Sequence, residues 1–360
     1  DEQLDPADRM ADEAVRRRCA TPAFGTVLTE HMVTMTWSAE RGWHDGAVRP
    51  YAPEPVDPAT AGLHYGQVVF EGLKAFHQAD GTVAAFRPAL HAKRFRTSAR
   101  RLVMPELPEA LFVDAIRALV DADRRWVPTE PDRSLYLRPL LYAADVSLAL
   151  RPASTYRFVV LASVTENFFG SSGAPVSVWV STRYSRAAPG GTGSAKCAGN
   201  YAGAFAGQRE AVEHGCDQVL WLDAAERRWI EEMGGMNIFW VTRGRNGAVL
   251  VTPALTDTLL PGVTRDSLLT VAHELGIATR ESRVAFDDFT AAVSRGEVTE
   301  AFACGTAAVV TPIGRIRAGH GEWHVGDGGI GPVAGRLRDA LIDLQRGRVP
   351  DPRGWLVHCG

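Results

Sequence analysis

Lysine is scarce in this chain of 360 residues: only three of its 39 basic residues are lysines, Lys74, Lys93 and Lys196. Arginine stays protonated in proteins, whereas a lysine amine can lose its proton and attack a carbonyl carbon. Because arginine supplies plain positive charge elsewhere in the chain, the chemistry of each remaining amine is a candidate for function.

Cysteine is also rare, and its positions follow no pattern. The five cysteines are scattered along the chain and never form a C-x-x-C pair: Cys19, Cys197, Cys216, Cys304 and Cys359. This spacing argues against a disulfide framework or a zinc site, and a reducing cytoplasm is the simplest location that fits it.

Other absences exclude further classes of protein. The formal net charge of -3 lacks the basic excess of a nucleic-acid binder. There is no apolar run of the ~20 residues that a bilayer span requires, and the acidic, polar first ten residues do not resemble a signal peptide. With 46% hydrophobic and 22% charged residues, the composition is that of a globular protein, and the length favours two domains.

Periodicity predicts a mixture of strands and helices without regular β-α-β alternation, which favours an α+β fold. The expected strands are 31–37, 68–76, 82–86, 134–142, 156–164, 176–181, 218–223, 236–242, 248–251, 307–312 and 316–318. The expected helices are 88–102, 108–126, 202–214, 264–275, 286–295 and 333–345. We predict an N-terminal domain over 1–166 with a flexible lead-in over 1–20, an interdomain loop over 167–175 and a larger domain over 176–360.

Lys196 lies in a glycine-dense loop, PGGTGSAKCAGNY, over residues 189–201. Glycine lets the backbone approach a ligand closely, so a lysine here is able to hold phosphate or form a Schiff base. The P-loop pattern fails because Ala195 precedes the lysine and Cys197 follows it. From the loop alone a surface lysine is about equally plausible, and the scarcity of lysine favours function.

Two segments are candidate anion sites. Gly262 stands at the entrance of the predicted helix 264–275, where free N–H groups and the helix dipole favour an anion. Gly305 and Thr306 begin a small-residue turn that can offer N–H groups and a hydroxyl. Taken singly, ordinary capping and a plain turn are the more probable interpretations.

Charged residues add weaker signals. One of the paired carboxylates Glu231 and Glu232 can place a fixed charge in a pocket, or both can mark a solvated strand end. Arg94 lies on an arginine-rich helix whose members mostly face solvent. The G-x-G-x-x-G run at 326–331 lies too near the end of the sequence for a dinucleotide fold and is predicted to be a turn, and no metal site is expected at His320 and His324.

The ordered set of motifs resembles the branched-chain aminotransferases, which are pyridoxal 5′-phosphate (PLP) enzymes of fold type IV. The resemblance covers nearly the whole chain and is carried by the segments 63–65, 69–76, 86–88, 93–95, 134–139, 196–201, 232–239, 260–265 and 305–307. It implies a small N-terminal α/β domain and a larger C-terminal domain with a pseudo-barrel of strands surrounded by helices. It also implies a homodimer with small-molecule substrates.

The resemblance also implies roles for individual residues. Lys196 matches the lysine that binds the cofactor and shuttles a proton, Glu232 the carboxylate facing the pyridine nitrogen, and Tyr201 the phenol near the ring oxygen. The phosphate is matched by Arg94, Gly262, Val263, Thr264 and Thr306. The substrate is matched by Phe24, Tyr65, Phe70, Tyr136, Arg138, Thr306 and Ala307.

The reaction implied is a ping-pong transfer from L-leucine, L-isoleucine or L-valine to 2-oxoglutarate. Two positions depart from many relatives: Asn167 replaces an aromatic residue, and Gly235 replaces a threonine. The alternatives are a D-amino-acid transaminase, an aminodeoxychorismate lyase or a specialised aminotransferase of a secondary pathway.

Overall fold

The computed structural model describes residues 4, 8–166, 174–245 and 247–360. These form two compact units. The first comprises Asp1–Phe168, Ala195–Gly199 and Asp343–Gly360, and the second comprises Phe169–Ser194 and Asn200–Ile342. Asn167 and most of the predicted interdomain loop lie outside the described residues.

The first unit is built on an antiparallel sheet in the order β18-β6-β5-β7-β8-β2-β3, with β1 paired to β8 and β4 paired to β7. Its strands are β1 (Val27–Leu28), β2 (His31–Ser38), β3 (Gly42–Pro50), β4 (Val68–Phe70), β5 (Leu73–His77), β6 (Val83–Phe86), β7 (Arg133–Ala143), β8 (Thr155–Glu166) and β18 (Leu356–His358). Its helices are α1 (Asp12–Arg18), α2 (Ala61–Tyr65), α3 (Pro88–Arg101), α4 (Glu109–Ala122) and the 3-10 turn η1 (Arg124–Trp126).

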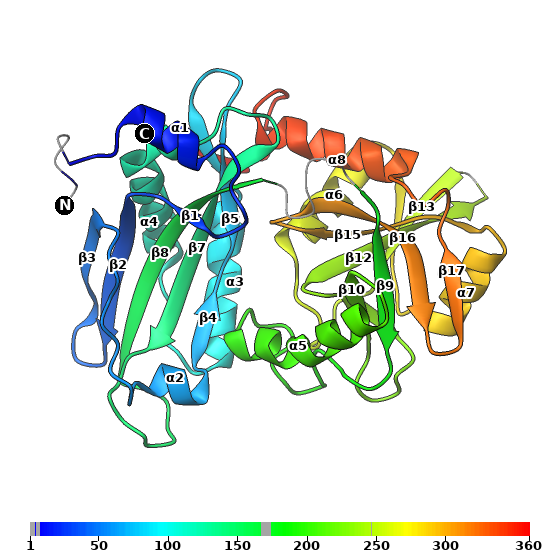
Figure 1. Ribbon diagram of the computed structural model, residues 1–360, viewed down its shortest axis with the longest axis horizontal. Coiled ribbons are helices and arrows are strands. Elements are labelled where there is room, and N and C mark those ends of the chain that lie inside the picture. The colour runs from blue at the N-terminus through cyan, green and yellow to red at the C-terminus, as the bar shows by residue number, and fades with distance from the viewer. Residues whose placement is uncertain (1–3, 5–7, 167–173, 246) are drawn as a thin grey trace. The chain divides into compact units, whose positions relative to one another are not determined.

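Helices α3 and α4 lie side by side and cover one face of this sheet (Figure 1). Phe95 of α3 and Phe112 of α4 pack in one core with Phe158 of strand β8, and all three side chains are fully buried. The predicted helix 108–126 is interrupted at Asp123, whose buried carboxylate accepts hydrogen bonds from the His31 backbone N–H and from Nδ1 of the His31 ring. Helix α1 lies within residues 1–20 and buries Val15 in the core.

The second unit is built on a sheet in the order β11-β10-β9-β16-β15-β12-β13-β14, and β11 also pairs with β12. This extra pairing closes β11, β10, β9, β16, β15 and β12 into a ring. The strands are β9 (Val176–Ser181), β10 (Gln218–Leu222), β11 (Ile230–Met233), β12 (Met236–Gly244), β13 (Gly247–Thr252), β14 (Ala278–Glu281), β15 (Val298–Gly305), β16 (Val309–Ala318) and β17 (Gly321–His324). The predicted α+β class and the pseudo-barrel are confirmed.

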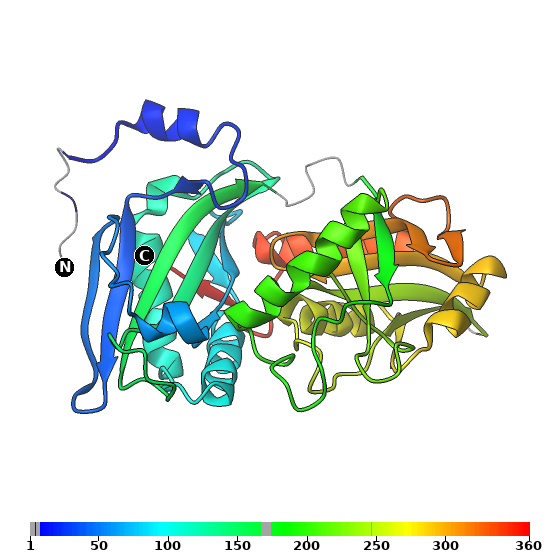
Figure 2. The ribbon, with the colours of Figure 1, turned by 60° about the horizontal axis from the view of Figure 1, so that its bottom comes forward.

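Helices α6 (Val263–Glu274) and α7 (Phe286–Ser294) belong to the second unit, and α7 packs beside β17 (Figure 2). Helix α5 (Ala198–Glu213) begins in the first unit and continues in the second, whereas α8 (Pro332–Gln345) runs from the second into the first. Helix α5 starts four residues before the predicted 202–214, so it includes the last residues of the predicted glycine loop 189–201. The two short strands predicted at 307–312 and 316–318 are one strand, β16. Residues 326–331 form the predicted turn.

Candidate active site

Glu232 occupies a buried position next to a tight turn. Strands β11 and β12 form a hairpin that turns at Gly234, whose φ of 54° lies in the left-handed region that glycine adopts without strain. The register sets Glu232 opposite Asn237. Glu232 is only 2% exposed. The hairpin therefore fixes the backbone position of Glu232.

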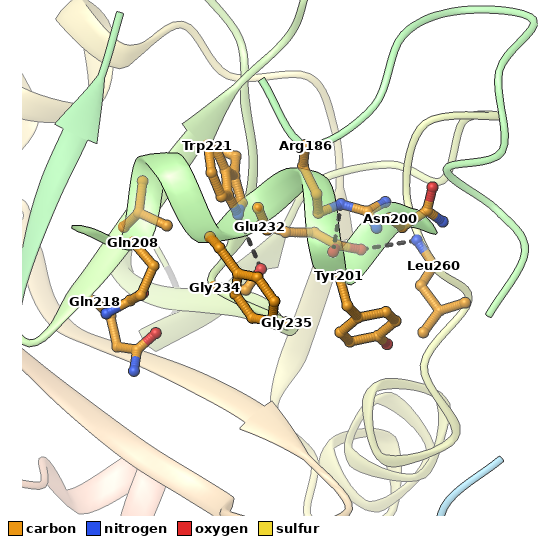
Figure 3. Close-up of a pocket in the computed structure, with 13 residues that line it drawn as sticks. Arg186, Asn200, Tyr201, Gln208, Gln218, Trp221, Glu232, Gly234, Gly235 and Leu260 are labelled. Atoms are coloured by element: carbon orange, nitrogen blue, oxygen red, sulfur yellow. Dashed lines mark hydrogen bonds and ion pairs between the residues drawn. The ribbon is translucent and has the colours of Figure 1, made fainter. Parts of the chain in front are cut away.

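An ion pair and two hydrogen bonds hold the Glu232 carboxylate. Its Oε2 forms an ion pair with Nε of Arg186 at 2.9 Å, and its Oε1 accepts from the Leu260 backbone N–H at 2.7 Å and from Asn237 Nδ2 at 3.3 Å. Figure 3 shows the carboxylate between Arg186 and Leu260. A guanidinium and two N–H donors stabilise the negative charge of a buried carboxylate.

Tyr201 borders the same region. A cavity of about 240 Å³ is lined by Arg186, Asn200, Tyr201, Ala204, Phe205, Gln208, Gln218, Val219, Trp221, Glu232, Gly234, Gly235 and Leu260 (Figure 3). A Cβ added to Gly235 would lie 3.4 Å from Tyr201 Cε1, within ordinary van der Waals contact. The glycine that departs from many relatives therefore widens the cavity beside the phenol ring.

Gly262 stands at the entrance of α6, the first of the two candidate anion sites. It is the N-cap residue, and no side chain caps the helix there. The first N–H groups of the helix, from Val263 and Thr264, therefore lack the side-chain partner that most helices supply. A Cβ at Gly262 would lie 2.0 Å from Asn237 Oδ1, so glycine is required by close packing.

The turn at Thr306 and Ala307 joins β15 to β16, closing at the pair Gly305 and Val309. Val309 has a φ of 59°, a conformation that β-branched residues rarely adopt. Cys304, two residues before Thr306, lies opposite Asn237 in the sheet. The side chain of Asn237 thus contacts Glu232 and the Leu260 carbonyl before the helix. Its backbone pairs with β15, the strand that leads into the turn.

Lys196 lies in the first unit. Its backbone N–H donates to Ser98 Oγ at 2.9 Å, and its carbonyl accepts from the Phe70 N–H at 3.0 Å. Its Nζ lies 4.8 Å from the centroid of the Phe70 ring. The lysine is half-buried and is held by α3 and the end of β4.

Arg94 is oriented by a buried carboxylate. Its Nε and Nη2 donate to the two oxygens of Glu71 at 2.7 and 2.8 Å, and His91 Nδ1 lies 2.7 Å from Glu71 Oε2. Burial alone raises the pKa of the Glu71 carboxyl, yet Arg94 and His91 hold that pKa well below its usual range. The guanidinium plane of Arg94 is consequently fixed.

Three of the four aromatic residues predicted for the substrate pocket, Phe24, Phe70 and Tyr136, form one cluster in the first unit with Arg138. The rings of Phe24 and Tyr136 meet edge to face, with centroids 4.9 Å apart. Arg138 donates from Nη2 to the Tyr136 hydroxyl at 2.8 Å, and its Cζ lies 4.8 Å from the Phe70 ring. Tyr65 lies elsewhere, on α2, where its hydroxyl donates to the Leu148 carbonyl at 2.6 Å.

The predicted residues are therefore divided between the two units. The first unit holds Phe24, Tyr65, Phe70, Arg94, Tyr136, Arg138 and Lys196, and the second holds Tyr201, Glu232, Gly262, Val263, Thr264, Thr306 and Ala307. Sequence reasoning missed two residues that contact the Glu232 carboxylate, Arg186 and Asn237. Asn237 stood within a quoted motif, but no local signal marked Arg186.

Comparison with known proteins identifies the class. The family model described as amino-transferase class IV matches residues 68–316. The branched-chain-amino-acid aminotransferase of Mycobacterium tuberculosis is 49% identical over 358 residues, 99% of this chain and 96% of that protein.

Solved structures agree with this match. The branched-chain amino acid aminotransferase of Escherichia coli superimposes with a TM-score of 0.75 at 29% identity, covering 91% of this chain and 98% of that chain. A T.th. branched-chain amino acid aminotransferase, solved with pyridoxamine 5′-phosphate, gives a TM-score of 0.74 at 29% identity over 92% of this chain and 99% of that chain.

This chain belongs to the branched-chain-amino-acid aminotransferases, within the class IV aminotransferases. The family, the transaminase activity and the PLP dependence predicted from the sequence are thereby confirmed. No helix in the described part of the chain is long and apolar enough to cross a membrane.

Proposed function

We propose that this enzyme transfers the amino group of L-leucine, L-isoleucine or L-valine to 2-oxoglutarate by a ping-pong mechanism. The observation that carries the proposal is the convergence on Asn237 of a buried carboxylate, an uncapped helix entrance and a small-residue turn. Each of the three has a counterpart in the cofactor and substrate of a transaminase.

The residues present fit PLP. The uncapped N–H groups of Val263 and Thr264, together with Arg94 and Thr306, suit a phosphate. The ionised Glu232 suits a protonated ring nitrogen, and Tyr201 suits the ring oxygen. When bound, the cofactor supplies an aldehyde that takes up the amino group and a ring that withdraws electrons from the substrate Cα.

The chain's own groups complete the chemistry. Lys196 Nζ would hold the cofactor and would accept and return the proton taken from the substrate Cα. The turn at Thr306 and Ala307 receives the substrate carboxylate. Tyr65 is assigned to the same carboxylate by the family resemblance alone, since its hydroxyl donates to the Leu148 carbonyl. Phe24, Phe70 and Tyr136 surround the branched side chain, and Arg138 attracts the γ-carboxylate of 2-oxoglutarate.

The molecular context is proposed on separate grounds. The first compact unit ends at Phe168, which supports a domain boundary near residue 166, but that unit also includes Ala195–Gly199 and Asp343–Gly360 from the predicted 176–360 domain. The five cysteines are free thiols, which supports a cytoplasmic location. A homodimer is supported by exposed apolar side chains on α2 and in the 146–150 segment. They are Leu63, Tyr65, Val146, Leu148 and Leu150.

Replacement of Lys196 tests the proposal. We expect Lys196→Ala to abolish leucine:2-oxoglutarate transamination and to prevent borohydride from attaching the cofactor covalently to the chain, because the amine that binds the cofactor and moves the proton is gone. The protein is expected to retain PLP through the phosphate contacts. A variant that turned over leucine at the wild-type rate would contradict the assignment.

A substrate panel decides between this function and its alternatives. With 2-oxoglutarate held constant, L-leucine, L-isoleucine and L-valine are expected to exceed D-alanine as amino donors in kcat/KM. Preference for D-alanine, or conversion of aminodeoxychorismate, would instead assign the chain to another chemistry of the same fold.

A further inference from the structure

Glu231, the neighbour of Glu232 in β11, is a buried carboxyl group that the proposed chemistry does not use. It is only 6% exposed. Its Oε1 lies 2.5 Å from the Thr258 hydroxyl, and its Oε2 is buried without a hydrogen-bond partner among the described residues. An ionised carboxylate with a bare, water-excluded oxygen is costly, whereas a neutral carboxyl group tolerates that environment.

Glu231 and Glu232 are connected through Arg186. Its Nη2 donates to the Thr258 carbonyl and, at 2.9 Å, to the Gly193 carbonyl of the glycine loop, while its Nε pairs with Glu232. Thr258 therefore contacts Glu231 through its side chain and Arg186 through its backbone. The Arg186 guanidinium therefore acts on both buried carboxyl groups: it pairs with Glu232 directly and lowers the pKa of Glu231 through its charge.

The donors favour Glu232 as the ionised member of the pair. Glu232 has the guanidinium, the Leu260 N–H and the Asn237 amide, whereas Glu231 has one hydroxyl. A protonated Glu231 is able to donate to Thr258 Oγ1, which in turn lies 2.8 Å from Thr256 Oγ1. This chain of hydroxyls provides a place for the proton.

Other charged groups around Glu231 do not change this assignment. Asp223, Asp257 and Arg283 line, with Glu231, a cavity of about 230 Å³. Asp223 accepts four backbone N–H groups, and Asp257 accepts the Gly190 N–H. Burial raises the pKa of Glu231, with Glu232 and Asp223 adding to the rise and Thr258 and Arg186 opposing it.

We propose that Glu231 is a positioning residue that carries a proton at neutral pH. Arg186 then forms its ion pair with Glu232 without competition from a second negative charge. This inference rests on the proposed role of Glu232 at the cofactor ring nitrogen. Ionisation of Glu231 at higher pH places a second carboxylate beside Arg186. The Arg186–Glu232 ion pair then weakens, and the charge facing the ring changes.

Infrared difference spectroscopy of the holoenzyme tests the proton directly. Subtracting the spectrum of Glu231→Gln from that of the wild type at neutral pH is expected to reveal the C=O stretch of a protonated carboxyl, which disappears as the pH is raised. The control Glu297→Gln, at a surface residue paired with Arg295, is expected to remove only carboxylate bands. Carboxylate bands alone in the Glu231 difference would overturn the proposal.

Kinetics test whether the proton matters for the reaction. The ratio of wild-type to Glu231→Gln kcat is expected to be constant at low pH and to change several-fold across the pH range in which the infrared band disappears. A ratio that stays flat over that range overturns the positioning role. The infrared result does not depend on turnover, so it remains readable even if the proposed transaminase reaction fails.

Two variants of Thr258 test the connection. Thr258→Val removes the hydroxyl that contacts Glu231, and Thr258→Ser keeps it. We expect the valine variant to shift the infrared titration and the kcat profile together, and the serine variant to restore both. Equal behaviour of the two variants overturns the proposal, because packing alone would then explain Thr258.

Discussion

Two buried carboxylates, Glu71 and Glu232, each engage an arginine, and each pair fixes a group with a proposed task. Glu71 orients Arg94 from two of its nitrogens. Arg186 orients Glu232 and also contacts the glycine loop through the Gly193 carbonyl. In both cases a desolvated charge is stabilised only while its partner is present, so these pairs are sensitive to neutralising substitutions.

Neutralising Glu71 is expected to destabilise the first unit. Glu71→Gln leaves Arg94 buried without a compensating charge, which corresponds to a loss of about 3–5 kcal/mol in the free energy of unfolding at neutral pH. The pKa of Glu71 is lowered in the fold from its ordinary 4.5, so its contribution is present above that value and is lost as the pH falls.

Denaturant unfolding of wild type and variant at several pH values measures this difference. The two free energies of unfolding are expected to converge as the pH drops below 4.5, the ordinary carboxyl pKa. A difference that is independent of pH would mean that packing, and not the charge, accounts for the effect.

Neutralising Glu232 is expected to affect the reaction more than the fold. Glu232→Gln keeps the shape and hydrogen-bonding capacity but removes the negative charge proposed to hold the ring nitrogen protonated. We expect kcat to fall by about 10²–10³, the size of effect seen when one preorganised electrostatic contact is removed. Single-turnover absorbance measurements with leucine check the result, and Glu297→Gln serves as the charge-matched surface control. Unchanged kinetics would move the role to Glu231 or elsewhere.

Single residues were predictable from the sequence where composition or position made them conspicuous. Lys196 stood out because lysine is rare and because its loop is rich in glycine, and Glu232 because it precedes a glycine pair. Arg186 has no such signal: it is one arginine among many, and two of its three contacts, with Glu232 and Thr258, come from segments distant in sequence. A partner that is met only after folding leaves no local pattern.

At the scale of elements, Gly262 satisfies two requirements at the entrance of α6. The helix must begin without a side-chain cap to leave its N–H groups available, and Asn237 must approach the backbone closely enough to reach the Leu260 carbonyl and Glu232. Gly262 meets both needs because it has no Cβ.

Gly262→Ala is expected to weaken PLP binding. The added Cβ would stand 2.0 Å from Asn237 Oδ1, so either the helix entrance or the Asn237 side chain must move. We expect the dissociation constant for PLP, measured by fluorescence titration of the apoenzyme, to rise at least ten-fold.

Gly335→Ala is the matched control for this substitution. A Cβ at Gly335 in α8 meets nothing within 4 Å, so PLP affinity should be unchanged and stability should rise by about 0.5–1 kcal/mol. An equal loss of PLP affinity in the two variants would contradict the role given to the α6 entrance.

Elements with a clear period were predicted well, and those without one were missed. Strand β9 has its predicted bounds, α3 and α7 each end one residue early, and α6 begins and ends one residue before its predicted bounds. Strand β15 was missed because nearly all its residues are buried, which removes the alternation of polar and apolar residues that marks a half-buried strand. The division between α4 and η1 depends on His31, far away in sequence, so helical periodicity alone gave no warning.

At the scale of the whole molecule, the sequence predicted the class of fold but not how the strands close. The α+β class followed from the lack of regular alternation. The ring in the second unit depends on pairing between β9 and β16, and between β10 and β9, in parallel registers joined across long stretches of chain. Such non-local pairings are set by packing in three dimensions, and resemblance to a family, not periodicity, anticipated the barrel.

The exposed apolar residues of the first unit provide the final prediction, for the assembly. Leu148 and Leu150 are 63% and 83% exposed, and Tyr65 contacts the Leu148 carbonyl from α2. Exposed apolar side chains this close together are typical of an interface, so the proposed homodimer is expected to bury them.

Leu148→Asp places a charge in that interface, and we expect the dimer to dissociate in size-exclusion chromatography with light scattering. Leu255→Asp makes the same change at a leucine that is 44% exposed in the second unit, and it should leave the mass unchanged. If Leu148→Asp and the wild type elute with the same mass, this surface is not the dimer contact.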